Sequence, residues 1–150
     1  MKIPAFFKVG PLEAAYIRAG LRIHELEIYG QIEFIIDTGA TRTIVSDRDA
    51  LWLGIDYRKL RKTKASMGIG GTVDTYEILG ATLSFATESR KSFKWSPEKI
   101  FAIKHKKIDE KVKSIPSILG RDFLNRFTLV YSKKTERVFI PDESFQQHLG

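Results

Sequence analysis

The residue best suited to chemistry is Asp37, which follows the apolar run Phe34-Ile35-Ile36 and precedes Thr38-Gly39. An ionised carboxylate next to a buried strand is costly to desolvate unless it is paired or hydrogen-bonded. Such a carboxyl group is suited to general acid–base catalysis. Asp-Thr-Gly also suits an ordinary turn after a strand, so these residues alone leave both interpretations open.

Few other side chains in the sequence offer a reaction centre. There is no cysteine, which excludes a disulfide framework, a thiolate zinc site and a cysteine nucleophile. His24, His105 and His148 are far apart and lack metal-ligand spacing, so we expect each to be a surface or structural residue. We expect no metal and no other cofactor. The glycine-rich stretch 68–73 has valine where G-x-G-x-x-G ends in glycine, and it is a weak phosphate-binding candidate.

Three segments, in the same order along the chain, resemble the motifs of the retropepsin-like aspartic proteases, the retroviral-type branch of that class. Asp37-Thr38-Gly39-Ala40 resembles their active-site loop, and Met67-Gly68-Ile69-Gly70-Gly71 resembles the tip of their flap. Ile118-Leu119-Gly120-Arg121-Asp122-Phe123-Leu124 resembles their hydrophobic-hydrophobic-glycine segment and the helix that follows it. The resemblance extends over roughly residues 23–140 and implies a cellular member that forms a single domain over residues 1–150.

The resemblance implies an aspartic endopeptidase, in which two carboxylates share one proton and hold the water that attacks the peptide bond. The sequence holds one Asp-Thr-Gly, and Asp122 lies in an expected helix after Gly120, where its charge suits the positive end. The second carboxylate is therefore expected from Asp37 of another copy in a homodimer. Thr38 is then expected to hydrogen-bond across the two-fold axis, and Gly39 to allow close backbone approach by the substrate, a peptide or unfolded protein.

The resemblance also implies how a substrate would be bound. Backbone groups of the flap would bind an extended peptide as the flap closes. Isoleucines at three positions match the lining of apolar specificity pockets, although Ile44 and Ile118 suit core packing equally well. The expected substrate-binding residues are Ala40, Arg42, Ile44, Gly68, Ile69, Gly70 and Ile118.

Three positions of the active-site loop depart from the family pattern. Thr41 stands where retroviral members commonly have an acid that pairs with the arginine matching Arg121, which leaves open how Arg121 is anchored and how tight the dimer is. Arg42 replaces another frequently acidic position, and we hypothesise that it favours an acidic substrate side chain. Ala40 lacks the hydroxyl that pepsin-like members often have there, so we expect a mildly acidic optimum, nearer neutrality than theirs.

These motifs need a mostly-β scaffold to hold them. Alternating apolar residues predict strands over 21–28 and 32–36, with a turn at Tyr29–Gly30 between them. A helix is expected to begin at Ser46 or Asp47 and to be stopped by Gly54. The fold class predicted is all-β: a retropepsin-like closed β-barrel, half of an acid protease, with a flap hairpin and one short helix on the C-terminal side. Further strands are expected at 43–45, 78–85, 95–103, 128–131 and 137–140, a hairpin around 65–73, and helical spacing over 121–127.

Composition and charge limit the remaining possibilities. At 150 residues and 43% hydrophobic content the chain fits one domain, and it contains no apolar run of the ~20 residues that span a bilayer. We expect a soluble, cytoplasmic protein with no membrane partner. The net charge of +7 is concentrated in residues 58–64 and 90–113, which we interpret as solvated surface.

Two other functions compete with the protease interpretation. One is a retropepsin-like peptide-binding or regulatory module with little turnover, against which the intact Asp37-Thr38-Gly39 argues. The other is a basic β-domain for nucleic acid, with Phe93 and Trp95 as stacking surfaces; we do not expect it, since both aromatics suit a strand. The segment 88–113 exceeds what the compact viral members need, and its sequence fits an extended hairpin, a docking arm or a basic patch.

Overall fold

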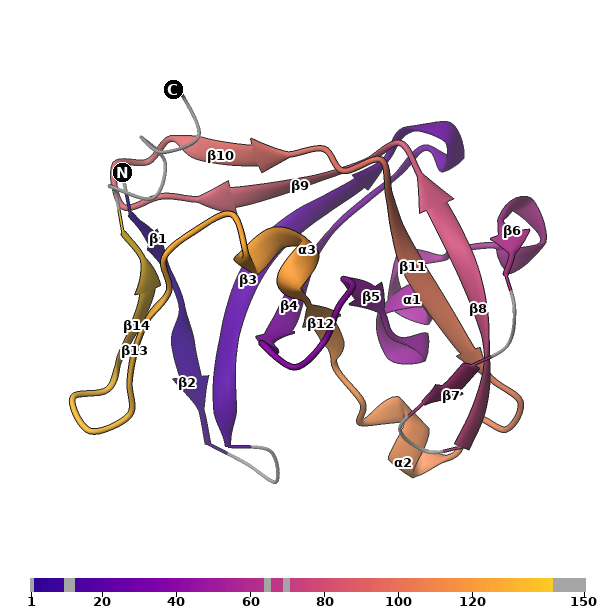
Figure 1. Ribbon diagram of the computed structural model, residues 1–150. Coiled ribbons are helices and arrows are strands. Elements are labelled where there is room, and N and C mark those ends of the chain that lie inside the picture. Colours follow the sequence, from indigo (N-terminus) through magenta and orange to yellow (C-terminus); the bar gives the residue numbers. More distant parts are fainter. Residues whose placement is uncertain (1, 10–12, 64–65, 69–70, 142–150) are drawn as a thin grey trace.

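The computed structural model describes residues 2–9, 13–63, 66–68 and 71–141. Strands dominate it, and short helices connect some of them (Figure 1). The strands are β1 (Ile3–Pro4), β2 (Phe6–Lys8), β3 (Ala14–Ile23), β4 (Ile28–Ile36), β5 (Ile44–Val45), β6 (Arg61–Lys62), β7 (Ser66–Gly68), β8 (Gly71–Leu79), β9 (Ala81–Ala86), β10 (Ser92–Trp95), β11 (Lys99–His105), β12 (Ser117–Leu119), β13 (Val130–Ser132) and β14 (Arg137–Ile140). The helices are α1 (Asp47–Leu53), α2 (Glu110–Lys113) and α3 (Arg121–Leu124), with 3₁₀ turns at His24–Leu26 and Tyr57–Lys59.

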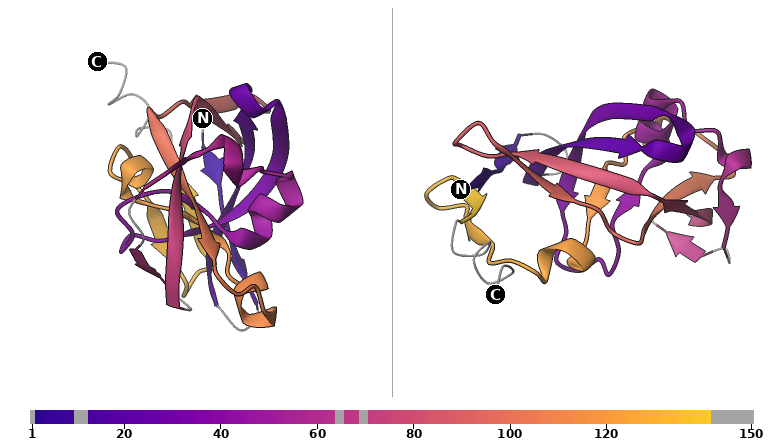
Figure 2. Two further views of the ribbon diagram at one scale, coloured as in Figure 1. Left: turned by 90° about the vertical axis from the view of Figure 1, so that its right-hand side faces the viewer. Right: turned by 90° about the horizontal axis from the view of Figure 1, so that it is seen from above.

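Most strands belong to one large sheet. Its order is β10-β9-β3-β4-β12-β5-β11-β8-β6, with β2 added to β3 and β7 added to β8. A small sheet of β1, β14 and β13 lies at the opposite end of the molecule from β6, β7 and β8 (Figures 1 and 2). Among the described strands this order is open, ending at β10 and β6, so the closed barrel predicted from the sequence is not found.

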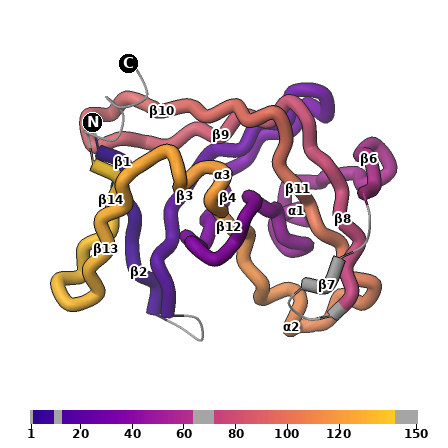
Figure 3. The backbone as a smooth tube through the Cα atoms, viewed as in Figure 1, coloured from indigo at the N-terminus to yellow at the C-terminus, as the bar shows by residue number. Residues whose placement is uncertain are grey.

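The position of β12 shapes the centre of the large sheet. β12 pairs in parallel with β4, placing Ile118 opposite Ile35, and antiparallel with β5, placing Ile118 opposite Ile44. β4 and β5 are therefore joined by a loop, residues 37–43, but separated in space by a strand from much later in the chain (Figure 3). The candidate site residues lie on this loop.

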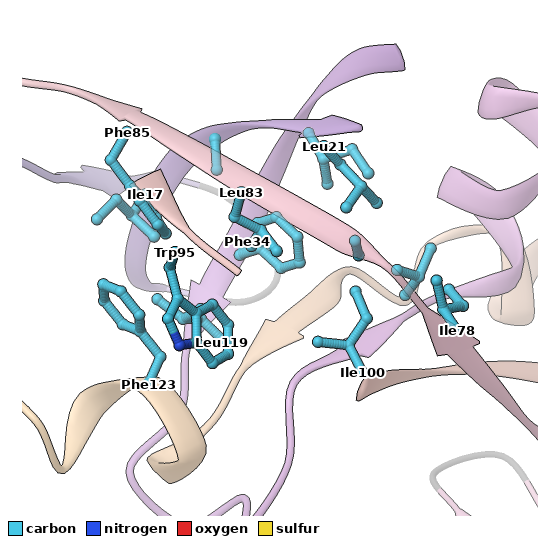
Figure 4. Packing of buried hydrophobic residues seen from close by; sticks show 14 of the residues in the cluster. Ile17, Leu21, Phe34, Ile78, Leu83, Phe85, Trp95, Ile100, Leu119 and Phe123 are labelled. Carbon is cyan, nitrogen blue, oxygen red and sulfur yellow. The ribbon is translucent and has the colours of Figure 1, made fainter. Parts of the chain in front are cut away.

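A single cluster of buried apolar side chains supports the sheet and fixes α3 to it. Phe123 of α3 is fully buried, with its ring centroid 4.8 Å from that of Phe85 and 5.1 Å from that of Trp95 (Figure 4). Phe34 and Leu119 are also fully buried in the same cluster. The same core therefore holds both β4 and the helix that follows β12.

The expected turn at Tyr29–Gly30 is wrong. The chain reverses at His24–Leu26 and at Glu27, whose φ of 54° is left-handed, and both Tyr29 and Gly30 lie inside β4. Gly30 is required there by packing, because a Cβ on it would lie 2.5 Å from Cδ2 of Leu53. A glycine needed for close approach was thus mistaken for a turn residue.

Two predicted strands each divide into two. Gly80, with a φ of 68°, separates β8 from β9 within the expected strand 78–85. The expected strand 95–103 is interrupted between β10 and β11 at residues 96–98, which include Pro97, a residue that cannot donate to a sheet. The segment 88–113 consequently forms the second strand of a β9–β10 hairpin, then β11 between β5 and β8, then α2.

The helix after β5 is confirmed as α1, and the short helix on the C-terminal side is confirmed as α3. The described residues also contain α2, which the predicted fold class did not include. The side chain of Ser46 accepts a hydrogen bond from the Asp49 N–H at the start of α1, and Gly54 ends the helix with a φ of 76°. Among the described residues, no helix combines the length and apolar character needed to cross a bilayer.

Candidate functional site

Asp37 stands at the end of β4, where that strand runs beside β12. Its backbone N–H donates to the carbonyl of Leu119 (3.1 Å), which continues the pairing of the two strands past Ile36. Asp37 itself is partly buried, while Thr38 and Gly39 are exposed. The strand pair therefore carries the carboxyl group from the core to the surface and fixes its backbone at that point.

The carboxylate of Asp37 also organises the turn that follows it. Its Oδ1 accepts a hydrogen bond from the Gly39 N–H (2.9 Å), and its carbonyl accepts one from the Ala40 N–H (3.2 Å). A Cβ on Gly39 would lie 3.2 Å from Oδ1 and would crowd it. Oδ2 accepts no hydrogen bond from any described residue. Asp37 therefore fits both interpretations from the sequence: Oδ1 stabilises a turn, and Oδ2 remains open for water, as acid–base catalysis requires.

Arg121, at the start of α3, anchors the loop through neutral oxygen acceptors. Its backbone N–H donates to the carbonyl of Ala40 (2.8 Å). Its guanidinium donates to the carbonyl of Thr38 (3.0 Å) and to Oγ1 of Thr41 (3.3 Å). The threonine that replaces the family's acid thus still contacts the arginine, as a neutral acceptor.

Asp122 forms a second link between α3 and the loop, which the sequence did not reveal. Its carboxylate accepts hydrogen bonds from the backbone N–H of Thr43 (2.9 Å), from the Thr43 hydroxyl (2.7 Å) and from the Phe123 N–H (2.9 Å). The placement of Asp122 at a helix start was right, but its main partner is Thr43, which is fully buried. These three donors occupy the carboxylate.

Gly120 allows the loop to approach this closely. A Cβ built on it would lie 2.5 Å from the carbonyl oxygen of Arg42 and 3.0 Å from that of Ala40. Its N–H donates to Oγ1 of Thr43 (3.2 Å). The glycine of the Ile-Leu-Gly segment is therefore explained by packing against the backbone of the Asp37 loop.

The structure brings together part of the predicted substrate-binding set. Ala40, Arg42, Ile44 and Ile118 lie on the loop or on the adjoining β5 and β12, and Ile44 and Ile118 are paired across those strands and partly buried. Gly68 lies in β7, opposite Gly71 of β8, and β11 separates β8 from β5. The described part of the chain confirms a hairpin here.

The tip of this hairpin lies outside the described residues. Ile69 and Gly70, both predicted to contact substrate, fall there. Their roles stay predictions, as does a movement of the hairpin as a flap.

Further buried polar groups brace the back of the site, and sequence reasoning missed them. The Ser117 hydroxyl, on β12, donates to Oδ2 of Asp49 (2.6 Å), and Oγ of Ser117 accepts from the Ser46 N–H (2.9 Å). All three residues are buried. Polar residues next to apolar runs were the only signal in the sequence, and that pattern does not identify partners 68 residues apart.

His105 is a structural residue, as predicted. Its Nδ1 lies 2.7 Å from Oδ1 of Asp47, its backbone N–H donates to Oδ2 (2.8 Å), and both side chains are 3% exposed. Nearby, the Tyr57 hydroxyl donates to the carbonyl of Ile103 (2.9 Å), and burial, reinforced by the Asp47 carboxylate, raises the pKa of Tyr57. Tyr57 therefore stays neutral. The hydrogen bonds between Asp47 and His105 brace α1 against β11.

The basic stretch 58–64 is partly neutralised by its surroundings. Arg58 donates to both oxygens of Asp56 (3.0 Å each), and Lys62 lies 3.5 Å from Asp74. Arg61 is paired in register with Glu77 of β8. Because these acids lie close to the basic side chains, they lower the net positive charge of the surface and weaken the case for nucleic acid as its partner.

Comparison with known proteins supports the motif analysis. A family model described as aspartyl protease matches residues 22–123, a span that includes the Asp37 loop, the β7–β8 hairpin and α3 up to Phe123. The crystal structure of a retropepsin-like aspartic protease from Rickettsia conorii resembles the chain with a TM-score of 0.56 and 20% identity, over 93% of this chain and 96% of that one. This likeness shows a shared fold.

Two further solved structures are more distant. The EIAV protease in complex with the inhibitor HBY-793 matches with a TM-score of 0.46 and 14% identity, over 79% of this chain and 91% of that one. The retroviral protease-like domain of Ddi1 from Leishmania major matches with a TM-score of 0.42 and 15% identity, over 85% and 95% of the two chains. A search of curated protein sequences found no match to the chain.

Proposed function

Because the chain belongs to the aspartyl protease family, we propose that it is a homodimeric aspartic endopeptidase in which Asp37 of two subunits activates the water that hydrolyses the peptide bond. The observation that carries this proposal is the Asp37 carboxylate itself. One oxygen is held by the Gly39 N–H, and the other accepts no hydrogen bond from the described residues. A module that only binds peptides does not need a carboxylate at this position with one oxygen accessible to water.

The second carboxylate has to come from another chain. Asp122 is the only other acid in the segments that resemble the family, and its oxygens are occupied by Thr43 and Phe123. The exposed Thr38 and Gly39 leave the Asp37 loop accessible to a second copy. An isologous two-fold contact would place each Asp37 opposite its symmetry mate, with Thr38 hydrogen-bonding across the axis.

The reaction follows from two close carboxyl groups that share one proton. The ionised group takes a proton from water as the water oxygen bonds to the carbonyl carbon, and the protonated group gives its proton to the carbonyl oxygen. The tetrahedral intermediate then collapses: the C–N bond breaks, the nitrogen takes the proton that the first carboxyl group had accepted from water, and the second carboxylate takes a proton from a hydroxyl of the intermediate as the carbonyl forms. A carboxyl end and an amine end are released, and the dyad again holds one proton. Such a pair titrates as a unit, so its two pKa values belong to the dyad rather than to either residue.

Substrate is proposed to bind as an extended strand beneath the β7–β8 hairpin. Two glycines face each other at the described end of that hairpin, Gly68 opposite Gly71, and glycine there lets backbone groups approach a peptide closely. Ile44 and Ile118, neighbours on β5 and β12, present apolar surface beside the Asp37 loop. Apolar side chains flanking the scissile bond are therefore expected to be preferred.

The proposal is tested by cleavage of unfolded proteins and peptide libraries with wild type and Asp37→Asn across acidic pH. Asp56→Asn is the matched control, because it makes the same chemical change at a turn far along the chain. We expect Asp37→Asn to lose activity while sedimentation shows an intact dimer, and the control to keep it. No cleavage by wild type at any pH would contradict the enzyme and favour a binding module.

Mixing the two forms tests whether one site needs two chains. With equal amounts of wild type and Asp37→Asn allowed to exchange subunits, about a quarter of the dimers contain two intact carboxylates. Activity at fixed total protein should then fall to about a quarter of the wild-type value. A fall to about a half would show that each chain works alone and would contradict the shared site.

A further inference from the structure

A hollow of about 420 Å³ opens next to the Asp37 loop, on the side of α3. It is lined by Arg42 of the loop, by Trp95 at the end of β10 and Lys99 at the start of β11, and by Asp122 and Arg126. Arg42 lies five positions after Asp37 in the sequence. The hollow is therefore continuous with the loop that carries the candidate catalytic carboxylate.

Positive charge converges on this hollow from separate segments. The guanidinium of Arg42 lies 5.9 Å from the ring centroid of Phe101, and the ammonium of Lys99 lies 5.8 Å from the same centroid. Arg42 is exposed, and no described residue accepts a hydrogen bond from its guanidinium. The ion pair that the structure shows for Lys99, with Glu77, has the long distance of 3.8 Å. Two cations so placed are stabilised by an anion that binds between them.

The acids of the lining, Glu98 and Asp122, offset only part of the charge of Arg42, Lys99 and Arg126. Asp122 already accepts three hydrogen bonds, two of them from Thr43, and among the described residues no ion pair joins it to Arg42. Glu98 is exposed to solvent. Beneath the hollow, Nε1 of Trp95 is buried without a hydrogen-bond partner among the described residues, on the side of the ring toward α3 (Figure 4).

We propose that this hollow receives a carboxylate side chain of the substrate, an aspartate or glutamate, and that Arg42 is its principal ligand, with Lys99 adding charge. The inference rests on the proposed endopeptidase function, because it is the substrate that brings the carboxylate. Arginine offers a planar fork that matches a carboxylate with two parallel hydrogen bonds. The acid is selected at an outer position of the peptide rather than beside the cleaved bond, since Ile44 and Ile118 already supply apolar surface there.

Two-fold symmetry gives this specificity a particular form. A homodimer has two such hollows, one on each side of the axis through the paired carboxylates. An extended peptide crossing the axis passes both, so acids on both flanks of the scissile bond are favoured, at similar distances from it. Each acid is expected to raise kcat/KM about tenfold, and the two together about a hundredfold if they act independently.

The test uses four peptides that share one cleavable core and differ at the outer positions: Gln on both flanks, Glu on one flank, Glu on the other, and Glu on both. Cleavage is measured with wild type, Arg42→Gln and Arg42→Glu, and with Glu98→Gln, which removes a rim acid. Arg22→Gln is the control, because Arg22 is an exposed arginine that lies over the ring of Tyr29 at the opposite end of β4. Binding of the same peptides to Asp37→Asn, with and without Arg42→Gln, is followed by fluorescence anisotropy.

We expect wild type and Arg22→Gln to prefer Glu on each flank and Arg42→Gln to lose this preference. Arg42→Glu should reverse it and cleave the peptide with Gln on both flanks best, and Glu98→Gln should strengthen the preference for Glu. Equal kcat/KM for all four peptides, with cleavage intact, would overturn the acid-binding hollow and leave the protease standing. No cleavage, but tighter binding of the Glu peptides that needs Arg42, would overturn the protease and keep the hollow. Equal binding of Glu and Gln peptides by Asp37→Asn would also overturn the hollow.

Discussion

Replacing Asp122 by alanine would remove the link between α3 and the Asp37 loop. The carboxylate accepts hydrogen bonds from the backbone N–H and hydroxyl of Thr43 and from the N–H of Phe123, at 2.7–2.9 Å. Thr43 is fully buried, so water cannot reach its N–H without a local opening of the structure. The variant therefore leaves backbone donors without an acceptor.

The free energy lost follows from those donors. Each buried donor left unpaired costs ~1–3 kcal/mol. The Thr43 N–H is enclosed and the Phe123 N–H lies beside the partly buried Asp122, so we expect a total of about 3 kcal/mol. For a chain of this length each kcal/mol lowers Tm by ~2–4 °C, so Asp122→Ala should melt about 6–12 °C below wild type.

Asp122→Asn provides a graded comparison. The amide keeps one acceptor oxygen for the Thr43 N–H, but its NH₂ group then faces the Phe123 N–H, donor against donor. About half of the loss is expected. Thermal and urea unfolding, followed by tryptophan fluorescence at one fixed protein concentration, measure both variants under conditions in which dimerisation contributes equally.

Activity separates this structural role from a catalytic one. If Asp122 were the second acid of a dyad within one chain, Asp122→Asn would abolish cleavage at every temperature. We expect it instead to cleave at a rate comparable to wild type well below its Tm. A Tm for Asp122→Ala within about 2 °C of wild type, or a folded but inactive Asp122→Asn, would refute the reasoning.

Three other changes test neighbouring parts of the site. Gly120→Ala places a Cβ 2.5 Å from the Arg42 carbonyl and should lower the free energy of unfolding by about 1–3 kcal/mol, measured by urea denaturation; an unchanged midpoint would contradict the close approach. Arg121→Lys keeps the charge but loses the fork that reaches the loop, so kcat/KM should fall about tenfold with Tm nearly unchanged; the reverse pattern would make Arg121 purely structural. The pKa of Glu33 lies below its usual value, chiefly because Lys8 donates a hydrogen bond to it, so the stabilisation is present above the unfolded pKa and lost as pH falls through the folded pKa. Below pH 4.5 wild type should therefore lose up to about 1 kcal/mol more stability than Glu33→Gln, and parallel acid-unfolding curves would contradict this.

The features that the sequence predicted well are local ones. The helix α1 was expected from Ser46 and Gly54, and both residues cap it through contacts within a few positions. The Asp37 turn was likewise identified from consecutive residues, and its hydrogen bond to the Gly39 N–H spans two positions. Short-range hydrogen bonds of this kind can be predicted from the residue types that follow one another in the sequence.

The features that it missed depend on contacts between distant segments. Asp122 meets Thr43 across 79 positions, and no spacing rule connects them. Glu27 closes the β3–β4 turn in a left-handed conformation that glutamate rarely adopts. The turn was therefore predicted at Gly30 instead. The strands β1 and β2, two and three residues long, are too short to show an alternating pattern. For these elements tertiary packing decides the conformation, and local propensity has little influence.

The insertion of β12 between β4 and β5 also determines when the site can form during synthesis. The Asp37 loop is held by hydrogen bonds to residues 119–122, and these link positions 77 to 83 apart in the chain. A nascent chain that ends before residue 117 has β4 and the Asp37 loop but lacks both the strand that belongs between β4 and β5 and the arginine that fixes the loop. Contacts of such long range form late in folding. Completion of the site is thereby delayed until most of the chain has left the ribosome, and partly made copies lack an assembled carboxylate loop.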